Sequence, residues 1–196
     1  MLDEKRIKEA QDNINIYQQE GLLFKIKSQN KDILGTYRSN YKESFAVAKK
    51  LFSDETSNLW VIVCSYYSMF YITNAVLYTL GYKIGLKIVH KVASDSLIAL
   101  VRRKLKKALI EDYEEAKKEA LDIIGRKTDE IIGSFDSEME KRSIFQYEST
   151  EEIKRTKANT SLERAKTFIF EMEKIAVIIF EQIKCKTLDF KKFLTS

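Results

Sequence analysis

The chain has 196 residues, of which 44% are hydrophobic and 32% are charged, and its formal net charge at pH 7 is +5. This is the balance of a globular chain that is long enough to bury a core. It has no proline and only six glycines, which argues against sandwiches and barrels, because their many turns need those residues. We therefore expect an all-α fold, an up-and-down helical bundle of four to five core helices with an extra N-terminal helix.

The chain is expected to divide into an N-terminal helical extension, residues 1–36, and a helical bundle, residues 37–196. Apolar residues recur with helical spacing from Asp3 to Tyr17, which predicts a first helix. Gly21 is expected to end that helix, and Gly35 is expected to mark a further break in the chain.

Between these glycines, residues 22–30 fit either a helix end or an extended linker. A second helix is predicted over Tyr37–Phe52, with Tyr41 and Phe45 among its inward-facing residues. Further along the chain, residues 82–85 are expected to form a short loop, and one or two helices are expected over residues 90–124.

The stretch from Trp60 to Tyr82 is almost without charge and is apolar or aromatic on nearly every side, as in a helix buried in a bundle. We predict that it begins near Ser57, whose side chain can accept a hydrogen bond from a free amide, and stops at Gly81. It is long enough to cross a bilayer, but its polar and aromatic residues, such as Asn74, argue against a lipid-facing helix.

The N-terminus and the cysteines indicate the cellular compartment. The N-terminus is charged from Asp3 onward and has no apolar core typical of a signal peptide. Cys64 and Cys185 lie in apolar helical patterns, which favours buried free thiols in a reducing environment. We therefore expect a cytoplasmic protein that has no membrane partner.

Charge is unevenly distributed along the chain. Residues 82–110 hold eight Lys or Arg and one Asp, whereas residues 111–140 hold eleven Asp or Glu and four Lys or Arg. The basic stretch predicts either a patch for phosphate or RNA, with Arg102 and Arg103 as substrate-binding residues, or a solvated helix face that pairs with acidic residues.

Most enzyme signatures are absent. The sequence has no glycine-rich phosphate loop, no Gly-x-Ser-x-Gly elbow and no Cys-x-x-Cys pair. His90 is the only histidine, and a lone histidine before a basic helix is more typical of a capping or surface residue. We expect no metal site and no cofactor, because one histidine and two distant cysteines make a tetrahedral zinc site improbable.

Two constellations remain. The aromatic block Tyr66–Tyr71 is interpreted as core and subunit contact in preference to base stacking. The segment from Arg142 to Tyr147 carries a guanidinium, which can bind phosphate as a planar fork, and a phenol, which can donate a hydrogen bond. Its spacing alone favours a structural role, with Arg142 paired to glutamates and Tyr147 packed under a loop.

Three features resemble the HEPN family of all-helical domains, over roughly residues 37–183. Ser65–Tyr82 is similar to the family's second-helix pattern, in which Tyr-Tyr-x-Met-Phe precedes a closing Gly-Tyr. His90–Leu97 resembles the entry to its third helix. Arg142–Tyr147 and the helical sequence after it resemble the arginine motif before the last core helix.

The resemblance implies a homodimer. In active HEPN ribonucleases an Arg and a His four to six residues later face the partner subunit's copy and cut RNA without metal, leaving a cyclic phosphate. Here Arg142 takes the arginine position and Tyr147 the histidine position. Because a phenol with a pKa near 10 is a poor general base at neutral pH, the chain is at most a metal-independent endoribonuclease.

HEPN proteins often pair with a nucleotidyltransferase as toxin and antitoxin, which makes Tyr147 a candidate modification target as well as a catalytic residue. We therefore expect a HEPN-like protein that binds RNA or a nucleotide, with weak or degenerate ribonuclease activity or a toxin-like role beside a nucleotidyltransferase. Arg142 and Tyr147 are the expected catalytic residues, with Ser143 and Asn74 in substrate binding. The alternative is a non-catalytic helical module for protein interaction.

Overall fold

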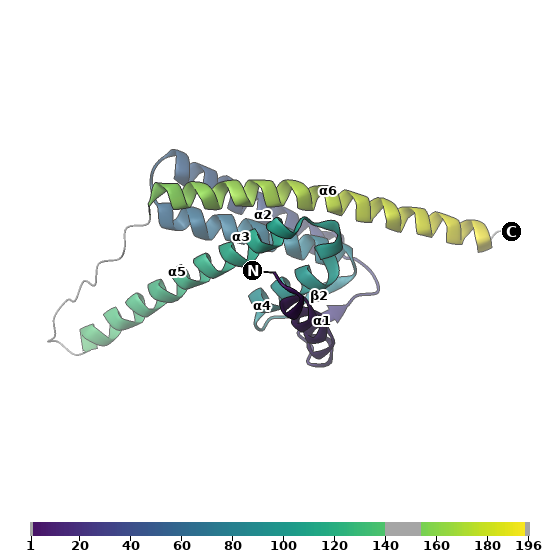
Figure 1. Ribbon diagram of the computed structural model, residues 1–196, viewed down its shortest axis with the longest axis horizontal. Helices are drawn as coiled ribbons and strands as arrows, with labels where there is room; N and C mark the ends of the chain where they lie inside the picture. The colour runs from purple at the N-terminus through teal and green to yellow at the C-terminus, as the bar shows by residue number, and fades with distance from the viewer. Residues whose placement is uncertain (1, 140–153, 195–196) are drawn as a thin grey trace.

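A computed structural model describes residues 2–139 and 154–194, and the side chains of residues 2–125 and 154–182 (Figure 1). It is an all-α helical bundle, as the composition predicts. In chain order the elements are α1 (Glu4–Gln19), β1 (Leu23–Lys25), α2 (Lys31–Ser53), α3 (Asn58–Thr79), β2 (Tyr82–Ile84), α4 (Val89–Ser96), the π-helix η1 (Leu97–Val101), the 3₁₀-helix η2 (Arg102–Lys104), α5 (Lys107–Met139) and α6 (Arg155–Leu194).

Helix α3 is the centre of the bundle and packs against α2, α5 and α6. Its start and end confirm the prediction. The Ser57 hydroxyl accepts a hydrogen bond from the Trp60 amide, at 3.4 Å, and Gly81 follows the helix with φ of +90°. That left-handed conformation costs glycine little because it has no Cβ, so the sequence ends the helix there.

Helix α3 is also long and apolar enough to cross a membrane. Its most apolar window, however, is 72% buried by the rest of the protein. The helices packed around it take the place that lipid would take, which is compatible with a soluble protein.

The first two helices differ in part from the prediction. Helix α1 ends before Gly21, as expected, and Gly21 has φ of +68°. Helix α2 begins at Lys31 and runs through Gly35, so the break predicted at Gly35 is wrong. A helix interior tolerates one glycine at a cost of about 1 kcal/mol, which packing against α3 offsets. The predicted boundary between residues 36 and 37 therefore falls inside a helix.

A two-stranded antiparallel sheet joins two segments, one predicted to be either a helix end or an extended linker and the other predicted to be a loop. Strand β1 pairs with β2, with Leu23 opposite Ile84 and Phe24 opposite Lys83. Leu23 and Ile84 are buried, whereas Phe24 and Lys83 are exposed on the other face. Three-residue strands carry too little periodicity to be predicted.

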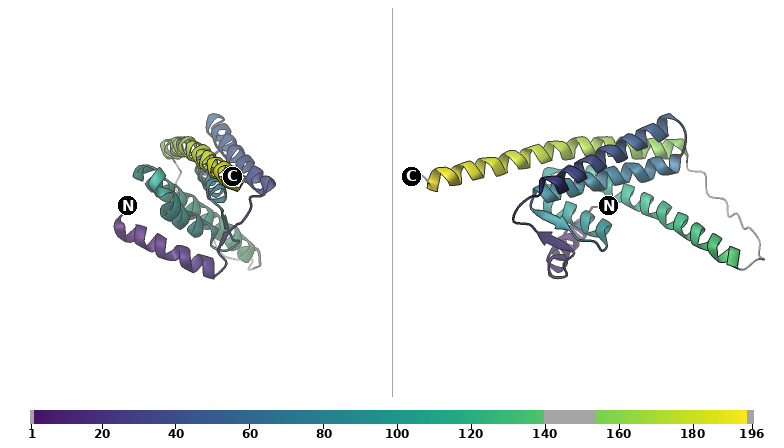
Figure 2. Two further views of the ribbon diagram at one scale, coloured as in Figure 1. Left: turned by 90° about the vertical axis from the view of Figure 1, so that its right-hand side faces the viewer. Right: turned by 180° about the vertical axis from the view of Figure 1, so that it is seen from behind.

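Helices α5 and α6 leave the bundle in opposite directions (Figures 1 and 2). Where they run together, acidic residues of α5 pair with basic residues of α6. Arg164 lies 3.2 Å from Asp112 and 3.8 Å from Glu119, and Lys157 lies 3.6 Å from Glu119. Part of the acidic stretch is thus neutralised within the fold, mainly by α6, and Lys107 of the basic stretch adds one contact, 4.0 Å from Glu111.

Candidate functional site

The predicted catalytic residues Arg142 and Tyr147, with Ser143 between them, lie outside the described residues. Helix α5 is described up to Met139 and α6 from Arg155. Cys185 also lies beyond the described side chains, whereas Cys64 is a free, partly buried thiol whose pKa is raised by burial.

The other predicted substrate-binding residues lie in different surroundings. Asn74 is 5% exposed, and its amide nitrogen donates a hydrogen bond to the carbonyl of Phe70, at 2.8 Å. Arg103 is exposed on η2. The neighbouring Arg102 lines a pocket of about 450 Å³ together with seven other residues: Leu2, Asp3, Glu4, Ile7, Leu105, Lys107 and Ile110. Two carboxylates and two cations balance there, so the pocket does not favour an anion.

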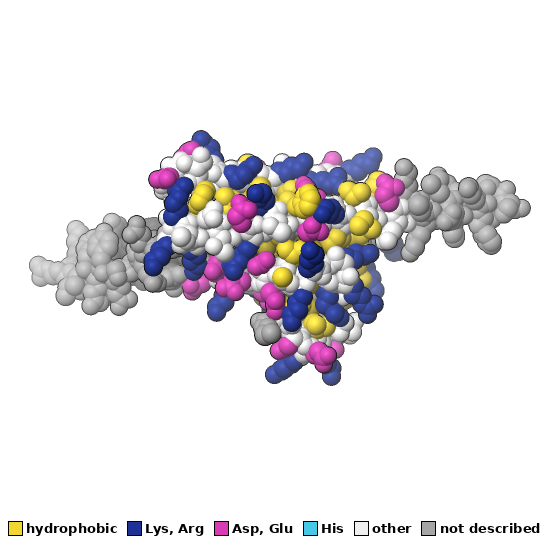
Figure 3. All heavy atoms as spheres, turned by 45° about the horizontal axis from the view of Figure 1, so that its top comes forward, with side chains coloured by type: hydrophobic (Ala, Val, Ile, Leu, Met, Phe, Trp, Pro, Cys, Tyr) yellow, Lys and Arg dark blue, Asp and Glu magenta, His cyan; other side chains and the backbone are white. Residues whose placement is uncertain are grey.

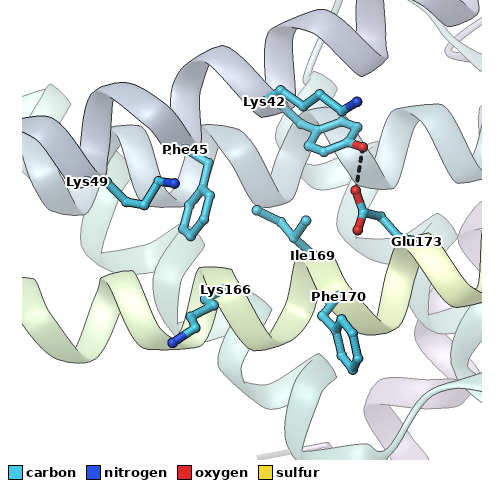
Figure 4. A pocket seen from close by; sticks show the side chains of 8 residues that line it. Lys42, Phe45, Lys49, Lys166, Ile169, Phe170 and Glu173 are labelled. Carbon is cyan, nitrogen blue, oxygen red and sulfur yellow. Dashed lines mark hydrogen bonds between the residues drawn. The ribbon is translucent and has the colours of Figure 1, made fainter.

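A more polarised hollow lies between α2 and α6 and is called the α2–α6 groove below. Its volume is about 370 Å³ (Figure 4). Eight residues line it: Tyr41, Lys42, Phe45, Lys49, Lys166, Ile169, Phe170 and Glu173. The first four come from α2 and the last four from α6, so the groove exists only because these two helices pack side by side.

Helical spacing explains why these side chains share the groove. Lys42, Phe45 and Lys49 stand at positions i, i+3 and i+7, which lie along one face of α2. On α6 the same argument places Lys166, Ile169, Phe170 and Glu173 on neighbouring turns. Ile169 is buried and forms part of the floor, while the lysines are exposed at the rim.

The groove carries more positive than negative charge. Within the described part of the chain, no carboxylate pairs with Lys42 or Lys49. Lys166 has one partner, Glu163 at 3.3 Å, in an exposed pair of small energetic value. The single lining carboxylate, Glu173, accepts a hydrogen bond from the Tyr41 hydroxyl at 2.7 Å. Three lysines and one carboxylate therefore line the groove, and the carboxylate is hydrogen-bonded to Tyr41.

Tyr41 stays protonated in this arrangement. Burial raises the pKa of its phenol, and the hydrogen bond and negative charge of Glu173 raise it further. The phenol is consequently a permanent donor that holds Glu173 in place at neutral pH.

Aromatic rings accompany these cations. The Lys49 ammonium lies 5.1 Å from the centroid of the Phe45 ring, and Lys174 lies 3.9 Å from that of Phe170. Phe170 is 57% exposed, and the Lys174 ammonium lies over one face of its ring. The surface view shows Lys and Arg, hydrophobic, and Asp and Glu side chains interspersed on one face of the molecule (Figure 3). Cations beside exposed rings suit a ligand that has both phosphates and flat bases.

A second charged cluster surrounds Asp95, and here the carboxylate is buried and its partners come from within the fold. The carboxylate of Asp95 in α4 is 1% exposed and lies 2.6 Å from the Arg6 guanidinium. It also accepts hydrogen bonds from Asn13 at 2.8 Å and Tyr17 at 2.6 Å, and lies 3.2 Å from Lys91. Burial alone raises the pKa of Asp95, but these hydrogen bonds and the Arg6 charge bring it below its ordinary value. This Asp95 network ties α1 to α4.

His90 lies beside this network and is partly buried. Its Nδ1 atom is 2.8 Å from the Tyr66 hydroxyl, and its ring centroid is 4.7 Å from that of Phe70 and 5.7 Å from that of Tyr67. Burial lowers the pKa of His90, and the positive charge of Lys117 lowers it further. The imidazole is therefore neutral at pH 7, in a setting more enclosed than the predicted cap or surface position.

Within the described ranges, no group of three or more His, Cys, Asp or Glu side chains could hold a metal ion. Comparison of the chain with models of protein families, with curated proteins and with solved structures finds no match. What the protein does is consequently argued from the groove and the sequence.

Sequence reasoning missed the α2–α6 groove. The pattern of Lys42, Phe45 and Lys49 was available as a signal, but Phe45 was predicted to face inward and the two lysines were not singled out. The partners on α6 stand more than a hundred residues later, and local spacing does not reveal that the two helices pack together.

Proposed function

We propose that the protein binds single-stranded RNA, holding its phosphates and one or more bases in the α2–α6 groove. The observation that carries this proposal is the set of three ammonium groups, from Lys42, Lys49 and Lys166, around a hollow with an exposed aromatic ring. Lys42 and Lys49 have no carboxylate partner among the described side chains, so an external anion is their natural counter-charge.

The dimensions of the groove support the same ligand. A volume of about 370 Å³ falls in the range of roughly 300–1,000 Å³ of small-molecule pockets, enough for a nucleotide unit. Single-stranded RNA exposes its bases, which can stack on Phe170, whereas a duplex hides them. The groove is open along the two helices, so a strand can continue past it.

The HEPN resemblance extends this proposal to cleavage. In this extension the protein is a cytoplasmic, HEPN-like RNA-binding protein with weak or degenerate metal-independent ribonuclease activity, and it acts in a toxin–antitoxin pair with a nucleotidyltransferase. Arg142 holds phosphate and Tyr147 donates a hydrogen bond. RNA is incubated with the wild type and with Arg142→Ala, with and without chelator. Equal background cleavage by both proteins contradicts the cleavage extension and leaves the binding proposal standing.

The binding proposal is tested by fluorescence anisotropy with a labelled single strand of roughly 12 nucleotides. The triple variant Lys42→Ala, Lys49→Ala, Lys166→Ala is expected to bind about tenfold or more weakly. Its plot of log affinity against log salt should also be shallower by about 2, since each lost phosphate contact removes about 0.7.

A matched triple variant, Lys5→Ala, Lys8→Ala and Lys118→Ala, removes the same charge from exposed positions on α1 and α5. It should keep most of the wild-type affinity. Equal losses in the two triple variants would mean that net charge, not the groove, attracts RNA.

The alternative, a non-catalytic interaction module, has one observation in its favour. Four large apolar side chains of α6 are at least half exposed: Phe170, Val177, Ile178 and Phe180. Exposed apolar rows of this kind mark protein interfaces, here with a second copy or a nucleotidyltransferase. We expect a homodimer in solution and a monomer for Val177→Glu, with Val47→Glu on α2 as control. A wild-type monomer by light scattering would remove the homodimer.

A further inference from the structure

The loop of residues 85–88, between β2 and α4, holds two aliphatic side chains in solvent. Leu86 is 99% exposed and Ile88 is 54% exposed. The loop is anchored at both ends. The Gly85 amide donates to the Leu22 carbonyl at 2.8 Å, and the Ile88 carbonyl accepts from the Val92 amide at 3.1 Å. The exposure is therefore built into the fold.

Ile88 is also strained. Its φ of +42° and ψ of +37° are left-handed, a conformation that β-branched residues rarely adopt. It precedes α4 as the N-cap residue and makes no side-chain capping hydrogen bond. Glycine would fit this backbone without strain. The position instead carries a large apolar side chain that gains little burial, which points to a contact outside the chain.

A third exposed apolar side chain stands next to the loop. Phe24 in β1 is 47% exposed. A Cβ added at Gly21 would lie 3.7 Å from the Phe24 ring, and one added at Gly85 would lie 3.0 Å from the Gly21 carbonyl oxygen. Phe24, Gly21 and the base of the loop thus form one continuous surface. Across the strands, Phe24 is opposite Lys83.

The two chain segments that build this surface carry positive charge, and the exposed Glu20 and Asp32 flank the first of them. These segments, residues 21–31 and 80–94, contain six lysines and no Asp or Glu. Lys91 pairs with Asp95. The other five pair with no carboxylate among residues 2–125 and 154–182, and all are exposed: Lys25, Lys27, Lys31, Lys83 and Lys87.

We propose that this lysine-rich loop surface, made of Phe24, Leu86 and Ile88 with Lys25, Lys83 and Lys87, docks on the surface of an anionic lipid bilayer. The lysines neutralise lipid headgroups, and the three apolar side chains enter the boundary between headgroups and acyl chains. This is peripheral contact, in which α3 stays buried inside the bundle. The proposal departs from the expectation of no membrane partner that was drawn from the sequence alone.

The side chains favour a bilayer over other anionic partners. Leu86 and Ile88 are aliphatic and offer no ring on which an RNA base can stack. Leu86 is 99% exposed, so almost no other side chain packs against it. It therefore protrudes from the surface and does not line a groove that could hold a peptide. A bilayer accepts protruding side chains without a complementary cavity.

The test is sedimentation of the full chain with vesicles of phosphatidylcholine alone and of phosphatidylcholine with roughly 30% phosphatidylserine. The wild type should bind the anionic vesicles and leave the neutral ones in solution. The variant Leu86→Ser/Ile88→Gly should bind roughly tenfold more weakly, because two exposed aliphatic side chains are lost. Lys25→Gln/Lys83→Gln/Lys87→Gln should lose binding to a similar extent.

Val47→Ser and Lys8→Gln, at exposed positions on α2 and α1, are the matched controls and should bind like the wild type. Each variant is checked for folding by circular dichroism and by wild-type RNA affinity, which the groove supplies independently. If the wild type does not sediment with anionic vesicles, the proposal is wrong. The proposal is also wrong if binding is lost in the lysine variant but unchanged in Leu86→Ser/Ile88→Gly, because the surface would then bind any polyanion by charge alone.

Discussion

The Asp95 network and the α2–α6 groove both concentrate charge, but they differ in where the counter-charges come from. Around Asp95, two cations and two hydrogen-bond donors surround one buried carboxylate. In the groove, Lys42 and Lys49 have no carboxylate partner among the described side chains, and Lys166 has only the exposed Glu163. The lining carboxylate, Glu173, is hydrogen-bonded to Tyr41. The fold therefore supplies the counter-charges around Asp95 but does not supply counter-charges for all of the groove lysines.

The contrast separates charges that hold the bundle together from charges that are available to a ligand. Removing a partner from a buried pair leaves an uncompensated charge, which is costly. Removing an exposed lysine that has no partner changes folding little but removes a contact for an anion. Stability and RNA affinity should therefore respond to different residues.

The largest effect is expected at the network. Asp95→Ala should lower the free energy of unfolding by about 3–5 kcal/mol, because Arg6, Tyr17 and Lys91 lose their shared partner. Urea unfolding followed by circular dichroism measures it, with the exposed Asp12→Ala on α1 as control. A loss as small as that of the control would show that the network is dispensable.

Acid should weaken the Asp95 network and the packing around His90. The pKa of Asp95 in the fold lies below its ordinary value, so its stabilising effect is complete above about pH 4 and is lost as the pH falls through the folded pKa. The folded pKa of His90 is also lowered, so a second loss starts below about pH 6.5. The free energy of unfolding, measured from pH 7 to acid pH, should no longer show the loss that starts below about pH 6.5 in the variant His90→Gln. An unchanged profile in that variant would contradict a buried neutral imidazole.

Tyr41→Phe is expected to change both the stability of the fold and the affinity for RNA. It removes the hydrogen bond to Glu173, which should cost about 1 kcal/mol of stability. It also frees a carboxylate at the edge of the groove, so RNA affinity should fall slightly. Glu173→Gln, measured by the same unfolding and anisotropy experiments, should instead raise affinity. A lower affinity in Glu173→Gln would mean that this carboxylate contacts the ligand.

The smallest change in stability is expected for Lys42→Ala, within about 0.5 kcal/mol of the wild type, because its ammonium is exposed and has no described carboxylate partner. Its RNA affinity should nevertheless fall, and its salt dependence should be shallower by about 0.7. Thermal unfolding and anisotropy on the same preparation give both values. Marked destabilisation would place Lys42 with the structural charges.

The features that were predictable from the sequence are local ones. The start of α3 at Ser57 and its end at Gly81 depend on single residues, and its buried character depends on an apolar run. The pairing of β1 with β2 was not predictable, because three-residue strands are held by backbone hydrogen bonds between distant segments. The α2–α6 groove was not predictable for a related reason, because it forms only where α2 packs beside α6. Asp95 looked like a lone acid in a basic stretch, and only packing brings Arg6 and Tyr17 to it.

The central claim is that RNA occupies the α2–α6 groove, and ultraviolet cross-linking of bound single-stranded RNA, followed by mass spectrometry of the peptides, tests it most directly. We predict cross-links on α2 around Phe45 and on α6 around Phe170, and their loss in the triple variant of Lys42, Lys49 and Lys166. Cross-links confined to the basic residues 102–107, with none on α2 or α6, would contradict the claim.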